Sequence, residues 1–303
     1  MRTSPCNLCP RLCGARRSEG QRGICGATDE VIVARAALHY WEEPPLSGAS
    51  GSGAVFFTHC PLRCAYCQNA DIAAGRAGKA VSTHRLAEIC LELQGQGALN
   101  INFVTPTHYA CQIAEAVRAA RSLGLTLPVV WNTSGYERVD IVRELEGTVD
   151  VWLADFKYAE PELALKYSNA PDYPETALAA IGAMAEQAGE PEFDEVDGQV
   201  RLTRGVIVRH LVLPGSLGQS KLALEKLWTH FGSRVLYSIM NQYTPVMTKG
   251  ELERFPELGC RVPDAEYEEL LDFADRLGIE DYFWQEGPAA LESFIPAWDG
   301  TGV

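Results

Sequence analysis

The chain has 303 residues, and 47% of them are hydrophobic, so it can bury a large core and wholesale disorder is excluded. It has 26 Lys and Arg residues against 40 Asp and Glu residues, and the net charge of −14 argues against nucleic acid or an anionic membrane as the main partner. The sequence shows neither an apolar leader nor a run of about 20 apolar residues that would span a membrane. We therefore expect a cytoplasmic protein.

The beginning of the chain is rich in Cys, Arg and Gly and has little apolar periodicity. Cys6, Cys9, Cys13 and Cys25 follow the spacing C-x2-C-x3-C-x11-C. Because cytoplasmic cysteines are seldom paired as disulfides, metal binding is their expected use. We interpret residues 1–45 as a small Cys-rich metal-binding segment. Its four thiols suit either a tetrahedral zinc site or an auxiliary [4Fe–4S] cluster, and we favour zinc.

After a Gly- and Ser-rich stretch, short apolar runs alternate with segments of helical periodicity. The apolar runs predict strands at 54–57, 101–104, 128–131, 149–156, 206–213 and 235–240. The periodic segments predict helices at 83–93, 113–123, 139–145, 176–188, 221–231 and 264–277. This alternation is typical of βαβ units around a parallel sheet.

The number of units distinguishes between the parallel folds. About six βα units are fewer than the eight of a closed barrel, so we expect a partial (β/α)6 TIM-like barrel over residues 46–290. A doubly wound open sheet fits the same alternation. Residues 291–303 have no periodicity and are interpreted as a C-terminal tail that covers one end or frays.

A second group of cysteines, Cys60, Cys64 and Cys67, directly follows the first strand of this barrel with the spacing C-x3-C-x2-C. The C-terminal ends of strands are where α/β barrels place their chemistry. Three thiolates can hold three corners of a [4Fe–4S] cluster and leave the fourth iron open to a small-molecule ligand. The alternatives are a zinc site with a distant fourth ligand, or buried cysteines, which do not usually occur in threes on one Pro-containing loop.

This loop, with the aromatic Tyr66 before its last cysteine, resembles the signature of the radical S-adenosylmethionine enzymes. Within that superfamily the chain is similar to uncharacterised iron–sulfur proteins related to pyruvate formate-lyase activating enzyme. The similarity includes NINFVTPTH at 100–108, WNTSGYE at 131–137, WLADFKY at 152–158, KYSNAPDY at 166–173 and RHLVLPG at 209–215.

The resemblance implies that Cys60, Cys64 and Cys67 hold a [4Fe–4S] cluster whose open iron is chelated by S-adenosylmethionine. One electron then breaks the sulfonium C–S bond, and the 5′-deoxyadenosyl radical takes a hydrogen atom from substrate. The substrate is a protein glycine, as for the activating enzymes, or a small molecule. The electron donor is expected to be a flavodoxin or a ferredoxin.

Other positions follow from the same resemblance. Asp155 and Lys157 match the family's Asp-x-Lys at the end of the fourth strand and are expected to act near the polar groups of the cofactor. Six further residues are expected to bind the cofactor: Tyr66, Thr105, Thr107, Asn132, Ser134 and Arg209. Arg209 and His210 are adjacent on the fifth strand, so one of the two must point into the barrel.

The sequence also departs from the activating enzymes at two positions. Their Gly-Gly-Glu segment, which meets the methionyl amino group, is replaced here by 104–108, where Thr105 and Thr107 offer hydroxyls but no carboxylate. Asn132 takes the place of an Asp and lacks its charge. Simpler interpretations compete as well, because Asp155 and Lys157 could form a strand-end ion pair and Arg209 could neutralise a buried acid. A non-catalytic iron–sulfur or zinc protein for electron transfer or scaffolding is the alternative function.

Overall fold

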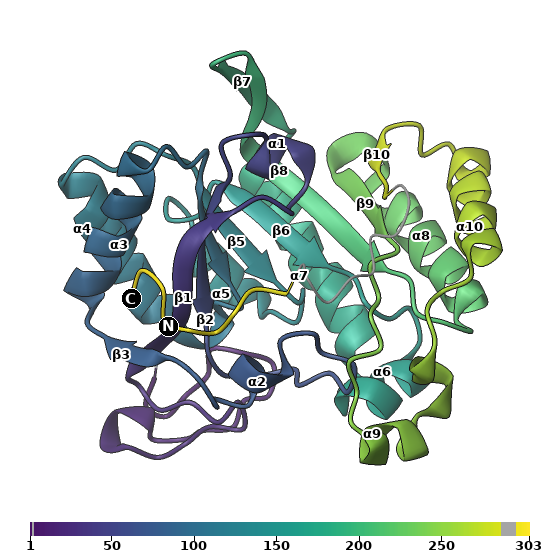
Figure 1. The fold of residues 1–303 in the computed structure, drawn as a ribbon, viewed down its shortest axis with the longest axis horizontal. Helices are drawn as coiled ribbons and strands as arrows, with labels where there is room; N and C mark the ends of the chain where they lie inside the picture. The colour runs from purple at the N-terminus through teal and green to yellow at the C-terminus, as the bar shows by residue number, and fades with distance from the viewer. Residues whose placement is uncertain (2, 286–294) are drawn as a thin grey trace.

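Parallel strands form the centre of the computed structural model, which describes residues 1, 3–285 and 295–303 (Figure 1). Within those residues a ten-stranded sheet has the order β10-β9-β8-β6-β5-β4-β2-β1-β3, with β7 paired to β8. The parallel strands are β2 (Ser52–Phe57), β4 (Ile101–Val104), β5 (Val129–Thr133), β6 (Val151–Asp155), β8 (Gln199–Leu211), β9 (Leu236–Met240) and β10 (Tyr282–Phe283).

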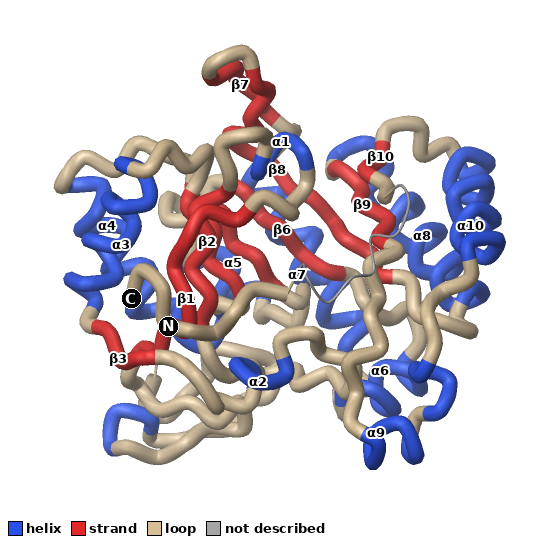
Figure 2. Tube along the Cα trace, in the orientation of Figure 1, coloured by secondary structure: helices blue, strands red, loops and turns tan. Residues whose placement is uncertain are grey.

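The order of these strands in space follows their order in the chain, as in a barrel, whereas a doubly wound sheet would reverse it. The two edges do not pair with each other in the described residues, so the barrel is open. This confirms the partial TIM-like barrel. The principal helices lie around the sheet (Figure 2). They are α3 (Thr83–Gly95), α4 (Ala110–Ser122), α5 (Val139–Glu144), α7 (Tyr173–Ala188), α8 (Leu217–Phe231) and α10 (Asp264–Leu277).

Several elements have no counterpart among the predicted ones. They are β1 (Val31–His39), β3 (Lys79–Val81), β7 (Glu192–Val196), β10 and the short helices α1 (Pro44–Ser47), α2 (Ala70–Ala73), α6 (Pro161–Ser168) and α9 (Lys249–Arg254). Strand β1 falls within the predicted Cys-rich segment, but it pairs antiparallel with β2 and belongs to the main sheet. The last residues of the chain run beside it, because Ala36 N–H donates to Thr301 O at 2.9 Å. Residues 291–294 of the predicted tail lie outside the described residues.

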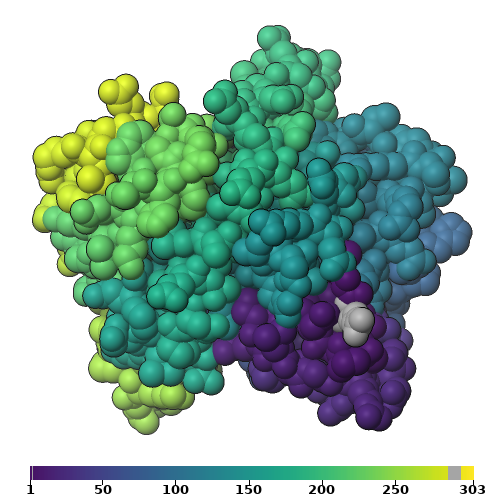
Figure 3. Space-filling model, turned by 180° about the vertical axis from the view of Figure 1, so that it is seen from behind, coloured from purple at the N-terminus to yellow at the C-terminus, as the bar shows by residue number. Residues whose placement is uncertain are grey.

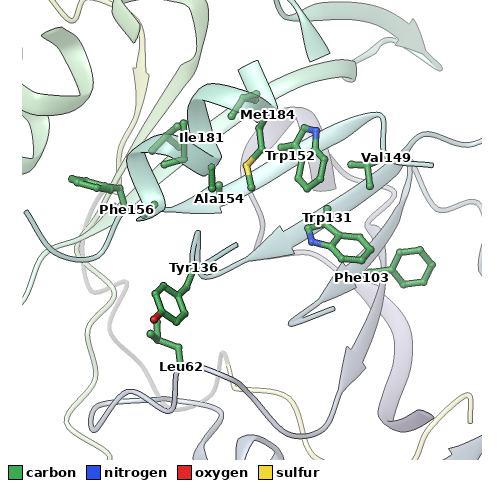
Figure 4. Packing of buried hydrophobic residues seen from close by; sticks show 14 of the residues in the cluster. Leu62, Phe103, Trp131, Tyr136, Val149, Trp152, Ala154, Phe156, Ile181 and Met184 are labelled. Atoms are coloured by element: carbon green, nitrogen blue, oxygen red, sulfur yellow. The ribbon is translucent and has the colours of Figure 1, made fainter. Parts of the chain in front are cut away.

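The sheet separates two apolar regions. Its outer face packs against the helices around Phe103, Trp131 and Trp152 (Figure 4). Its inner face forms an apolar floor with Leu46 from α1, and this floor also contains Val130, Val151, Leu153, Leu202 and Ile207. The floor lies toward the N-terminal ends of the strands, which leaves the C-terminal ends open for polar groups. In the described part of the chain, no helix combines the length and apolarity needed to cross a bilayer.

Candidate active site

The loop after β2 carries the three cysteines Cys60, Cys64 and Cys67. All three are free thiols and line one cavity of about 230 Å³ at the C-terminal ends of the strands. The loop turns sharply at His59 and Arg63, whose φ values of 68° and 55° are left-handed. The sequence therefore places three soft donors of one loop into a single cavity at the catalytic end of the barrel.

The donor set fits an iron–sulfur cluster. Burial raises the pKa of Cys60 and raises that of Cys67 to about 12, so both are neutral thiols until a metal supplies the positive charge that stabilises the thiolate. Among the described residues, no group of three or more His, Cys, Asp or Glu side chains is placed to hold a single metal ion. A cubane cluster does not require such a group, because each thiolate binds a separate iron.

A polar layer in the barrel lies between this loop and the apolar floor, and Arg209 is at its centre. Arg209 Nε donates to Asp155 Oδ1 at 2.8 Å, and its Nη2 donates to Asn132 Oδ1 at 2.6 Å. Its Nη1 lies 3.2 Å from Glu42 Oε2. Lys157 Nζ extends the layer by donating to Asp155 Oδ2 at 2.5 Å. Two acids and two bases therefore meet in the cavity.

Burial and neighbouring charges shift the pKa values of the groups in this layer in different directions. Burial opposes ionisation of Asp155, but Arg209 and Lys157 outweigh it and lower the pKa of Asp155. Burial also opposes the charge on Lys157, and Asp155 outweighs it, so the pKa of Lys157 is raised. For Glu42 burial prevails over Arg209 and Asn102, and its pKa is raised. Asp155 is thus the firmly ionised carboxylate of the site.

Most of the residues that the resemblance indicated lie together in the cavity. Its lining includes Tyr66, Thr105, Asn132, Ser134, Asp155, Lys157 and Arg209. Arg209 points into the barrel, whereas His210 points toward the helices, where its Nε2 lies 2.9 Å from Ser220 Oγ. The two simpler interpretations also describe real contacts, since Asp155 pairs with Lys157 and Arg209 neutralises acids. These contacts fix the polar groups in place, and the groups still line the cavity.

Thr107 is the exception. It is buried and absent from the cavity lining, and its hydroxyl donates to Glu137 Oε1 at 2.6 Å. Thr107 therefore does not reach the cavity where a cofactor contact was expected. The chain turns at Thr105, where φ is 59°, and directs the next residues inward. Thr105 stays at the cavity, with its N–H bonded to Asn132 O at 2.9 Å.

Sequence reasoning missed two buried acids. Glu42 accepts hydrogen bonds from Asn102 and Asn132, both at 3.1 Å, although it precedes the first barrel strand in a stretch that looked like chain punctuation. Glu137 accepts from Thr107, Thr133 and Trp131, and burial raises its pKa to about 7. Glu137 ends the WNTSGYE segment, but nothing in the spacing of that segment marked it. No local pattern pointed to Glu42.

The N-terminal cysteines gather in one place. A Cβ added at Gly23 would lie 3.3 Å from Cys25 Sγ and 3.4 Å from Cys13 Sγ, and the Cys13 sulfur is hydrogen-bonded with Cys6. Burial raises the pKa of Cys9 to about 12, and the charges of Cys25 and Cys6 add to this effect. The four thiols therefore lie near one another, although in the described part of the chain they are not placed to hold a single metal ion.

A buried cation lies beside these sulfurs. Arg17 is 1% exposed, donates to His108 O and Thr28 O at 2.6 Å, and lies 3.7 Å from Cys6 Sγ. Among the described residues no carboxylate forms an ion pair with it. An uncompensated buried charge is costly. A metal bound by four thiolates would carry negative charge and would supply that counter-charge.

Comparisons with known proteins agree with this geometry. Residues 54–194 match the family model of the Radical SAM superfamily. An uncharacterised protein of Methanocaldococcus jannaschii is 27% identical over 289 residues, which cover 91% of this chain and 75% of that protein.

Two solved structures have a similar fold. Streptococcus suis SuiB bound to its precursor peptide SuiA has a TM-score of 0.51 and 12% identity, and covers 75% of this chain. A radical SAM methyltransferase from Sphaerobacter thermophilus also has a TM-score of 0.51, with 13% identity over 78% of this chain and 67% of that one. The chain spans only 46% of SuiB, and at these identities the likeness concerns the fold alone. The matching region, the open parallel barrel and the three-cysteine loop together identify residues 54–194 as a Radical SAM domain.

Proposed function

We propose that this radical SAM enzyme holds a [4Fe–4S] cluster on Cys60, Cys64 and Cys67 and cleaves S-adenosylmethionine reductively. The observation that carries the proposal is that three thiols of one loop share a cavity with polar residues at the ends of β5, β6 and β8. The cluster that these cysteines would hold would supply one electron for reductive cleavage of the sulfonium C–S bond to methionine and a 5′-deoxyadenosyl radical, the species that would abstract hydrogen from substrate.

The polar residues of the cavity suit the methionyl end of S-adenosylmethionine. A carboxylate has about four lone-pair sites, and Arg209 and Lys157 occupy two of those on Asp155. We assign the amino group of the methionyl moiety to Asp155, because the segment after β4 offers no carboxylate to the cavity. Lys157 has three N–H donors and gives one to Asp155, so it can also donate to the methionyl carboxylate.

We assign the support of the adenine to Tyr66, the aromatic residue of the cysteine loop. Tyr66 is 4% exposed and is surrounded by Tyr158, Tyr167 and Tyr243, whose ring centroids lie 6.3, 5.9 and 6.3 Å away. These edge-to-face contacts fix the ring and exclude water around it. Thr105, Asn132 and Ser134 offer hydroxyl and amide groups to the ribose and the adenine edge.

The substrate class follows from the resemblance and not from a contact in the cavity. A protein glycine would make the chain an activating enzyme of a glycyl-radical enzyme, whereas a small molecule would make it an oxidoreductase of another kind. The reducing electron would come from a flavodoxin or a ferredoxin. Transfer of deuterium from a candidate substrate into 5′-deoxyadenosine tests either class.

Turnover is the test of the proposed function. We would purify and reconstitute the protein without oxygen, add S-adenosylmethionine and dithionite, and measure 5′-deoxyadenosine by mass spectrometry. We expect product from the wild type and from Cys260→Ser, an exposed loop cysteine outside the cavity, and none from Cys64→Ala. An intact cluster without product would instead support a non-catalytic iron–sulfur protein.

We propose that the N-terminal cysteines hold a second metal centre, either zinc or an auxiliary [4Fe–4S] cluster, and the buried Arg17 supports an anionic centre of this kind. A variant with Cys60, Cys64 and Cys67 all changed to Ala isolates that centre for metal analysis. Zinc that remains bound identifies a structural knuckle, and iron with sulfide identifies a cluster. Loss of all metal would contradict the second centre.

A further inference from the structure

Arg11 stands between Cys9 and Cys13 in the chain, but its side chain leaves the N-terminal segment and reaches the radical SAM loop. Its Nε donates to Pro61 O at 3.0 Å, and its Nη2 lies 3.5 Å from Leu62 O. These two carbonyls belong to the peptides between Cys60 and Cys64. A side chain anchored beside the N-terminal cysteines therefore fixes the backbone that separates two cysteines of the catalytic loop.

The same guanidinium also holds the end of α6. Its Nη2 donates to Ser168 O at 2.8 Å and its Nη1 to Asn169 O at 2.5 Å, where φ of 48° ends the helix. One residue earlier, Tyr167 O accepts from Ala65 N–H of the cysteine loop at 2.8 Å. The loop is thus bonded to α6 directly and again through Arg11.

A second connection runs in the opposite direction. Arg63, between Cys60 and Cys64, donates through its Nη2 to Cys25 O at 3.2 Å. The approach is close, since a Cβ added at Gly26 would lie 2.8 Å from the same Nη2. Each cysteine group therefore sends one arginine to the backbone of the other. Figure 3 shows the N-terminal segment, in purple, at the surface against later parts of the chain.

An aromatic ring supports the first connection. The Arg11 guanidinium carbon lies 5.3 Å from the centroid of the Tyr136 ring. That ring lies beside Leu62 of the cysteine loop (Figure 4), and its hydroxyl donates to Asp172 at 2.8 Å. The guanidinium thus contacts an aromatic ring as well as four carbonyls. Arginine suits this position because its planar fork presents fixed donors and stacks on aromatic faces.

We propose that Arg11 is a positioning residue for the radical SAM cluster, and that the metal state of the N-terminal centre reaches the catalytic cluster through it. The proposal rests on the function proposed above. Hydrogen bonds that hold the surroundings of metal ligands orient those ligands and tune the metal. Without Arg11 the peptides at Pro61 and Leu62 can rotate, and Cys60 and Cys64 then no longer stand at a fixed separation.

The test compares Arg11→Gln with Arg11→Lys and with Arg16→Gln, a control in the same segment whose side chain is 70% exposed and pairs with Glu19. Each protein would be reconstituted anaerobically. We would record the electron paramagnetic resonance spectrum of the reduced cluster with and without S-adenosylmethionine, and the rate at which a chelator removes iron. We expect Arg11→Gln to lose iron from the catalytic cluster about tenfold faster and to change its spectrum. Arg11→Lys should recover part of the effect, and Arg16→Gln should match the wild type.

A spectrum and a rate of iron loss unchanged in Arg11→Gln would overturn the proposal. If Arg11→Gln does not fold, Arg63→Gln removes the reciprocal bond and is judged by the same two measurements. Changing Cys13 and Cys25 together to Ser should alter the spectrum of the catalytic cluster in the same direction as Arg11→Gln, and an unaltered spectrum would refute transmission. A wild-type cluster whose spectrum ignores S-adenosylmethionine would instead refute the proposed function itself.

Discussion

Arg209 and Asp155 stand opposite each other on the neighbouring parallel strands β8 and β6, with Nε 2.8 Å from Oδ1. Both side chains point into the barrel and are nearly buried, with 12% and 13% of each exposed. The pair is a structural contact, and the proposed function gives it a second role in the site. Arg209 keeps Asp155 ionised, and an ionised carboxylate at a cavity wall can hold a ligand's amino group.

Asp155→Asn tests that pair. The amide keeps the shape of the side chain but leaves Arg209 without its closest anion, and removing one partner of a buried pair costs about 3 kcal/mol of unfolding free energy. Chemical denaturation measures this cost. Asp140→Asn is the control, because Arg138 and Asp140 are more exposed, at 26% and 52%, and such pairs contribute less than about 1 kcal/mol. Equal losses in the two variants would contradict a special role for the buried pair.

The raised pKa of Glu137 predicts a contribution to stability that falls as the pH rises. A salt-bridged acid has the opposite pH dependence. The pKa of Glu137 is about 7 in the folded chain and 4.5 as the reference value, so the folded state binds its proton more tightly. The associated stability is complete below about pH 4.5 and is lost as the pH rises through about 7. The shift corresponds to about 3 kcal/mol.

Glu137→Gln removes this titration and keeps the oxygen that accepts from Thr107 and Thr133. We expect the variant to lose less unfolding free energy than the wild type between pH 5 and pH 8, as measured by urea denaturation at each pH. Other acids such as Glu42 titrate in both proteins and cancel in the difference. Parallel pH profiles would show that Glu137 is ionised throughout and would contradict its raised pKa.

Substitutions of the two threonines after β4 should have different effects on stability and on binding. Thr107→Val leaves Glu137 without one donor, so we expect a loss of about 1–2 kcal/mol in unfolding free energy and unchanged binding of S-adenosylmethionine. Thr105→Val removes a hydroxyl from the cavity and should weaken that binding a few-fold, with less effect on stability. Calorimetric titration and denaturation measure the two quantities. Weakened binding in Thr107→Val would restore the role that the sequence suggested for it.

Features encoded by neighbouring residues could be predicted from the sequence, whereas features that depend on residues far apart in the chain could not. The six barrel strands were predictable because each is a short apolar run that both faces of the sheet bury. Strand β7 could not be predicted, because Glu192, Asp194 and Glu195 make it polar and exposed. Its backbone pairing with β8 defines it as a strand, and it has no apolar pattern. Strand β1 contains an apolar run at Val31, but the neighbouring cysteines dominated the interpretation of that region.

The same distinction holds in the site. Cys60, Cys64 and Cys67 carry a local spacing, so the sequence alone identified them as one group. Glu42 and Arg11 act on partners 167 and 158 residues away, namely Arg209 and Asn169, and no local spacing encodes such contacts. The sequence also could not decide which way Thr107 points, because that depends on the left-handed turn at Thr105. Long-range contacts, not the cofactor loop, are therefore what the structure adds.

Two glycines provide the last test, because both have a left-handed φ while their surroundings differ. Gly26 has φ of +94° and Gly20 has φ of +84°, so an Ala at either position costs about 1–2 kcal/mol from the left-handed backbone alone. At Gly20 the new Cβ meets nothing within 4 Å, whereas at Gly26 it lies 2.8 Å from Arg63 Nη2 and 2.9 Å from His59 Cδ2. We expect Gly26→Ala to displace the cysteine loop and to lose iron from the catalytic cluster faster than Gly20→Ala. Iron release to a chelator measures the difference, which isolates the contact between the two cysteine groups from backbone strain. Equal rates in the two variants would show that this contact does not support the catalytic loop.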